Sequence, residues 1–222
     1  MKFGYLLILM LCVSNLFGTK PLVVNENYKG FIGTAMSYYI DPSGSLDFEN
    51  IFKLYENDRF VPNKEPIYAQ SSPIPVYWFT FELRSEIDKE VWINVNNSNL
   101  SKIEFYKLSA DNTILHHTVS GSIYPDSTRF HDCYTFWYPV IEAKDTATYR
   151  YFIAATASLT MEMPVELGTF QELSLRERAS DYFTLFFMGA MLIMLLYNLV
   201  IFFFTRDNVY GYYSFCILGI IF

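Results

Sequence analysis

The chain has 222 residues, of which 52% are hydrophobic and 19% aromatic, and its formal net charge is -7. This length suffices for one domain of ordinary size together with membrane segments. An acidic chain without a basic run lacks the positive face that phosphate binding requires, so nucleic acid is excluded as an expected partner.

The N-terminus has the pattern of a secretory signal. Lys2 precedes an uncharged apolar stretch over residues 3–13, which is too short to span a bilayer. Residues 1–18 are therefore predicted to be a signal peptide. Cleavage is favoured over retention as an anchor, although Leu16 stands where a small residue is preferred. A lipoprotein at Cys12 is the weaker alternative, because Leu11 precedes the cysteine. In each case the residues that follow are exported.

Residues 22–174 are predicted to form an all-β sandwich. Apolar and other residues alternate with period two over residues 77–83, 91–95, 102–105 and 149–153. Such alternation gives each strand one core face and one outer face. Turn-forming residues separate the runs at the spacing typical of a sandwich. One helix is expected near the start, capped by Ser45, with Phe48, Ile51, Phe52 and Tyr55 facing inward. The domain has one cysteine, Cys133, so it cannot form an internal disulfide.

Two interpretations are open for the three tryptophans of the β domain, Trp78, Trp92 and Trp137. They could line a groove, because sugars and other ring compounds pack on flat aromatic faces. The favoured alternative is that the second sheet or the N-terminal segment covers them, because tryptophan is highly buried on average.

Residues that could perform chemistry are few. His116 and His117 are adjacent and therefore point to opposite faces of a strand. His131 and Cys133 could reach one metal ion, but a site needs three or four ligands. The sequence contains no Gly-rich phosphate loop, GxSxG or HExxH motif. We therefore predict no catalytic residue, no metal and no cofactor, and that the chain is not an enzyme.

The C-terminal part is predicted to enter the membrane. Residues 182–205 carry no charge, and a helix of that length exceeds the hydrocarbon core of about 30 Å. Residues 209–222 are again apolar and are expected to be the start of a second, incomplete membrane helix. Within the first helix, Gly189, Tyr197 and Asn198 are predicted to pack against neighbouring helices, although hydration of Asn198 at the inner interface is an equal alternative. The signal orients the β domain outward and the turn at Arg206 inward.

The order of these features resembles bacterial seven-transmembrane receptors with diverse intracellular signalling modules, specifically the second type of extracellular sensor domain and the first membrane helices. The resemblance lies in residues 38–41, 78–83, 91–96, 100–106, 129, 149–153, 159–164, 189, 195–199, 206–207, 210 and 212–213. Thr80 departs from the pattern, because a basic residue is common at that position.

The resemblance implies a jelly-roll sandwich similar to carbohydrate-binding domains, seven membrane helices and a cytoplasmic signalling module. The expected location is the bacterial inner membrane, with the N-terminal domain in the periplasm. A small ligand, carbohydrate-related among the options, is expected to contact Trp78, Trp92 and Arg129. Two alternatives stay open: a membrane-anchored module that binds a protein or envelope partner, and an extracellular glycan hydrolase. The oligomeric state, including a homodimer, is also left open.

Overall fold

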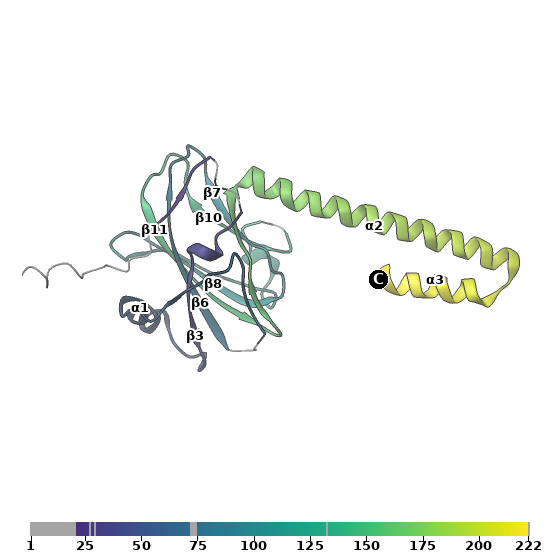
Figure 1. The fold of residues 1–222 in the computed structure, drawn as a ribbon, viewed down its shortest axis with the longest axis horizontal. Helices are drawn as coiled ribbons and strands as arrows, with labels where there is room; N and C mark the ends of the chain where they lie inside the picture. Colours follow the sequence, from purple (N-terminus) through teal and green to yellow (C-terminus); the bar gives the residue numbers. More distant parts are fainter. Residues whose placement is uncertain (1–20, 27, 29, 72–74, 132, 222) are drawn as a thin grey trace, which may run out of the picture. The chain divides into compact units, whose positions relative to one another are not determined.

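The computed structural model describes residues 21–221 except 27, 29, 72–74 and 132. The predicted signal peptide, residues 1–18, lies outside the described residues. The chain divides into two compact units, Met1–Phe170 and Gln171–Phe222. We call them the β unit and the helical unit and describe each separately (Figure 1).

The β unit is a sandwich of two main sheets, which confirms the predicted fold class. The larger sheet has the strand order β4-β3-β6-β11-β8-β9, and β1 pairs in parallel with β6. The smaller sheet has the order β10-β7-β13-β2, and β5 pairs with β12 in a separate ribbon. The strands are β1 (Leu22–Val24), β2 (Gly30–Phe31), β3 (Ser37–Asp41), β4 (Val61–Pro62), β5 (Tyr68–Gln70), β6 (Val76–Ser85), β7 (Val91–Val95), β8 (Leu100–Leu108), β9 (Ile114–Ser120), β10 (Phe136–Ile141), β11 (Thr148–Ala157), β12 (Met161–Met163) and β13 (Val165–Thr169). Two short 3-10 helices, η1 (Gly33–Ala35) and η2 (Asp126–Thr128), lie in the connections.

The core lies between the two sheets and uses the inward faces that the alternation predicted. Phe79 on β6 and Ile93 on β7 are both fully buried in it. The sheets also meet through specific contacts. Phe105 stacks on Tyr138 with 4.4 Å between ring centroids, and the hydroxyl of Tyr151 donates to the carbonyl of Val140 at 2.6 Å. Buried Tyr hydroxyls need such partners, so the hydrogen bond fixes how β11 faces β10.

Helix α1 (Phe48–Glu56) covers the outer face of the larger sheet. Its four predicted inward residues pack there, and Phe48 stacks on Tyr106 at 4.4 Å. The N-cap is Asp47, not Ser45 as the sequence suggested. Asp47 is extended and its Oδ1 accepts the amide of Asn50 at 2.9 Å, whereas the hydroxyl of Ser45 pairs with that of Ser43.

Two helices, α2 (Phe170–Thr205) and α3 (Asn208–Ile221), follow the strands. The helical unit contains α3 and all of α2 except its first residue, Phe170. Among the described residues, α2 alone is long and apolar enough to cross a membrane, judged by length and composition. The predicted span, residues 182–205, lies within it. Strand β13 ends at Thr169 and α2 begins at the next residue, whereas the sequence placed the end of the β domain at residue 174.

Helices α2 and α3 pack closely at Gly211. A Cβ atom added at Gly211 would lie 3.1 Å from Cε2 of Phe202, so the absence of a side chain permits the approach. Ser214 and Ile217 are buried along the same helix, and the hydroxyl of Ser214 donates to the carbonyl of Tyr210 at 2.9 Å. Small residues at helix contacts are typical of membrane helix pairs.

Candidate functional site

A pocket of about 440 Å³ opens in the β unit beside strands β8, β9 and β10 and the turn that follows β10. Its volume lies within the range that small-molecule sites occupy. The lining residues are Glu90, Lys107, Leu115, His116, Phe130, Pro139, Val140, Ile141, Glu142, Asp145 and Tyr149. The pocket therefore combines ring and aliphatic surface with three carboxylates, one ammonium group and one imidazole.

One wall is a preorganised polar group. The hydroxyl of Tyr149 donates to Oδ2 of Asp145 at 2.6 Å, and the amide of Ala147 donates to Oδ1 at 2.9 Å. The ammonium of Lys107 lies over the Tyr149 ring, 4.1 Å from its centroid. Register explains part of this arrangement, because Lys107 pairs with Tyr151 on β11, two residues beyond Tyr149.

The electrostatics of this wall follow from burial and hydrogen bonding. The hydrogen bond to Asp145, with burial, raises the pKa of Tyr149 to about 12, so this hydroxyl is a donor at neutral pH. Burial alone would raise the pKa of Asp145, but the bonds from Tyr149 and Ala147 outweigh it and lower the pKa. Desolvation lowers the pKa of Lys107 despite the nearby carboxylates of Asp145 and Glu142.

The other wall carries the ring surface. Phe130 is 43% exposed, and its ring lies 5.7 Å from that of His116 and 6.0 Å from that of Tyr138. Nε2 of His116 is 2.7 Å from the hydroxyl of Thr118. His117 points to the opposite face, where it stacks on Tyr106 at 4.2 Å. The prediction that the two histidines face opposite sides is thereby confirmed.

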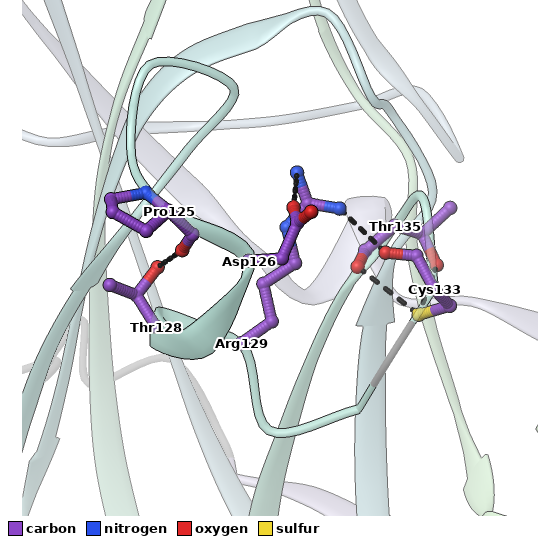
Figure 2. A network of polar contacts seen from close by, with 6 residues as sticks. All are labelled: Pro125, Asp126, Thr128, Arg129, Cys133 and Thr135. Carbon is purple, nitrogen blue, oxygen red and sulfur yellow. Dashed lines mark hydrogen bonds and ion pairs between the residues drawn. The ribbon is translucent and has the colours of Figure 1, made fainter.

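Arg129 holds the loop that carries Phe130. Its Nη1 donates to the carbonyl of Cys133 at 2.6 Å, and its Nη2 lies 3.4 Å from Oδ1 of Asp126 (Figure 2). The guanidinium also lies 5.1 Å from the centroid of the Phe136 ring. The planar fork of arginine suits such simultaneous contacts. Arg129 does not line the pocket, but its contacts hold the loop that carries the neighbouring pocket residue, Phe130.

Two of the three residues predicted to contact a ligand, Trp78 and Trp92, are not brought together. Trp78 is 4% exposed beneath α1, whereas Trp92 lies on the outer face of the smaller sheet against Trp137 and Phe170. The burial of Trp78 agrees with the favoured interpretation, although α1 covers it rather than the second sheet or the N-terminal segment. Neither Trp78 nor Trp92 lines the pocket.

The predicted helix-packing residues have different surroundings. The amide nitrogen of Asn198 donates to the carbonyl of Met194 at 2.8 Å, so part of its polarity is satisfied within its own helix. A Cβ atom at Gly189 would meet no atom within 4 Å, and Tyr197 is exposed. Gly211, which the sequence analysis did not select, makes the close contact between α2 and α3.

Sequence reasoning also missed the pocket residues Lys107, Phe130, Asp145 and Tyr149. One feature of the sequence could have indicated the pocket. Ile114 and Leu115 are exposed apolar residues that open β9 and break the alternation seen in the core strands. An exposed apolar patch of this kind often marks an interaction site.

Comparisons with known families match two segments of the chain. The family model described as 7TMR-DISM extracellular 2 matches residues 33–169. The model described as 7TM diverse intracellular signalling matches residues 180–222. No curated protein matches the chain.

Proposed function

The chain belongs to the family of membrane receptors that join a 7TMR-DISM extracellular domain to a membrane region with diverse intracellular signalling, and we propose that its pocket binds a small polar ligand with a flat ring face. Carbohydrate derivatives are the class of compound that we propose first. Membership makes the chain a membrane sensor with its β unit outside the membrane. We further propose the bacterial inner membrane as its location, with the β unit in the periplasm.

The observation that carries the ligand proposal is the opposition of two kinds of wall in one pocket. The exposed ring of Phe130 offers a flat apolar face, and the paired groups of Lys107, Asp145 and Tyr149 offer fixed donors and acceptors. A sugar presents the same combination, because one face of its ring carries C–H groups and its edge carries hydroxyls. A mostly apolar pocket with a few placed polar groups is the usual form of a ligand site.

Trp78 and Trp92 do not enter this proposed site, because neither is among the residues that line it. Arg129 contributes to it through the loop that holds Phe130. Binding would bias the packing of the membrane helices only if the ligand had different affinities for two states of the receptor. We propose that a cytoplasmic module outside these residues produces the output and that this chain has no catalytic activity of its own.

The proposal is tested with the chain reconstituted in lipid nanodiscs. A panel of neutral, acidic and amino monosaccharides and disaccharides is screened by thermal shift, and the hits are measured by calorimetry. Phe130→Ala should weaken binding of a hit about tenfold, because losing a ring contact worth about 1.4 kcal/mol raises the Kd by that factor. Phe31→Ala is the matched control, because Phe31 is similarly exposed on β2 and is not among the pocket residues.

Two results would contradict the proposal. The first is a panel in which no compound shifts the unfolding temperature. The second is a hit whose affinity is lowered equally by Phe130→Ala and Phe31→Ala, because the ligand would then not depend on this pocket.

A further inference from the structure

We propose that Arg129, Phe130, Cys133, Thr135 and Trp137 form a relay that couples the pocket to Phe170, the residue at which helix α2 begins. Phe170 belongs to the β unit and is also the first residue of α2. The relay is therefore defined entirely by contacts within the β unit. Its role as a signal path rests on the proposed function, whereas the coupling itself can be measured without a ligand.

The relay begins at the pocket wall. Phe130 lines the pocket, and the adjacent Arg129 binds the carbonyl of Cys133 through Nη1. The side chain of Arg129 is 13% exposed, so its hydrogen bond is largely shielded from water. A hydrogen bond with a charged donor is stronger than a neutral one. A displacement of Phe130 would consequently be transmitted to the backbone at Cys133.

The next step runs through side chains that point toward one another in Figure 2. Sγ of Cys133 lies 3.3 Å from the carbonyl oxygen of Thr135 and 3.6 Å from its hydroxyl oxygen. The same hydroxyl oxygen accepts the indole N–H of Trp137 at 2.8 Å. Thr135 thus joins the loop of Arg129 to Trp137 near the start of β10.

The last step is a cluster of rings around Phe170. The Phe170 centroid lies 5.5 Å from Trp137, 5.2 Å from His131 and 5.4 Å from Trp92. His131 and Trp137 are also in contact, at 5.2 Å. These separations are those of favourable edge-to-face pairs. Trp137 is 1% exposed, so it cannot move without displacing its neighbours.

The connection to α2 is short. Thr169 is paired with Val91 in the smaller sheet, and Phe170 follows it without a spacer residue. Phe170 is itself the first residue of α2, so a displacement of its ring acts directly on the residue at which the helix begins. A change at Trp137 is therefore expected to reach the first turn of α2. Coupling between the two ends of the relay is measured as an effect at residues 168–171 of a substitution at the pocket end.

The test uses hydrogen exchange measured by mass spectrometry on the unliganded chain in nanodiscs. Arg129→Lys keeps the charge but removes the planar fork that reaches both Cys133 and Asp126. We expect exchange to increase about fivefold or more in residues 133–137 and also in residues 168–171. Exchange in α1 should not change.

Arg150→Lys is the matched control. Arg150 is also partly buried, also pairs with a carboxylate, Glu82, and also lies over a ring, that of Tyr55 at 4.9 Å. It contacts α1 rather than the relay, so its substitution should increase exchange in α1 and leave residues 168–171 unchanged. A second variant, Thr135→Val, keeps the side-chain shape and removes the oxygen that accepts the Trp137 indole. Thr135→Val should also increase exchange at residues 168–171, and it tests the relay independently if Arg129→Lys does not fold.

The outcomes separate the relay from the ligand proposal. If Arg129→Lys and Thr135→Val alter exchange only up to residue 137, the relay is wrong even when a sugar binds the pocket. If Arg150→Lys alters residues 168–171 as strongly as Arg129→Lys, the effect is general destabilisation and the relay is again wrong. If both relay variants alter residues 168–171 while no sugar binds, the relay stands and the proposed ligand class is wrong.

Discussion

Trp78 and Trp92 lie on opposite outer faces of the same sandwich. The neighbouring residues Phe79 and Ile93 point into the core between the sheets, so each tryptophan points away from it. Trp78 is covered by α1 and contacts Phe48 with 6.3 Å between centroids. Packed sheets are about 10 Å apart, so a small ligand cannot contact both indoles at once. The pocket beside β8 and β9 is lined by neither indole.

The first prediction concerns the indole N–H of Trp78, which is buried and has no hydrogen-bond partner in the described structure. Trp78→Phe removes this unsatisfied donor and keeps a ring against Phe48, so it should lower the free energy of unfolding by under about 1.5 kcal/mol. Trp78→Ala leaves a cavity beneath α1 and should cost about 3–5 kcal/mol. Chemical unfolding followed by circular dichroism measures both. Equal costs for the two variants would contradict this prediction.

Local sequence patterns predicted the core strands but not the pocket. Alternation places Phe81 or Val95 inward without knowledge of any neighbour, because it depends on the two-residue period of a strand. The pocket depends on register instead. Lys107 meets His116 because β8 and β9 pair at those residues, and Phe130 arrives from a separate loop. No single segment contains that information.

The helix α1 shows the same division between local and tertiary information. Its inward face follows from residue spacing, whereas its N-cap depends on which of several nearby polar residues adopts the extended conformation. Ser43 and Ser45 instead join the turn around Asp41, whose Oδ1 accepts the hydroxyl of Ser43 at 2.6 Å and whose Oδ2 accepts the amide of Leu46. The cap therefore begins two residues later than predicted.

The second prediction compares two glycines with positive φ. Gly121 has φ +147 and a Cβ atom there would lie 2.2 Å from the carbonyl oxygen of Ser101, whereas Gly30 has φ +128 and open space around it. Gly30→Ala should incur only backbone strain, about 1–3 kcal/mol. Gly121→Ala should incur that strain and a clash with the β8 backbone, and should destabilise the β unit more. Unfolding temperatures of the two variants provide the comparison, and a smaller loss for Gly121→Ala would contradict the close contact.

The third prediction concerns the contact between α2 and α3. Gly211→Leu should separate the helices, because the side chain would collide with Phe202. Gly189→Leu is the control, because a Cβ atom there meets nothing within 4 Å. Distance measurements between spin labels on the two helices in nanodiscs should show a change for the first variant only. Because packing drives membrane helix association, the loss of this contact should also lower the thermal stability of the helical unit.

The last prediction is a loss of stability in acid through Glu104. Burial alone would raise its pKa, but the hydrogen bonds from Lys102 and from the Tyr106 hydroxyl at 2.7 Å outweigh burial and lower it. A carboxyl group whose pKa is lower in the folded protein contributes stability above its unfolded pKa, about 4.3, and that contribution is lost as the pH falls through the folded pKa. Glu104→Gln should therefore flatten the decline in stability below about pH 5, by under about 1 kcal/mol because Lys102 is exposed to solvent. Glu162→Gln, at an exposed position on β12, is the control. Unfolding free energies measured over a pH series decide the matter, and equal slopes for Glu104→Gln and the unmodified chain would show that this carboxylate is not selectively stabilised by the fold.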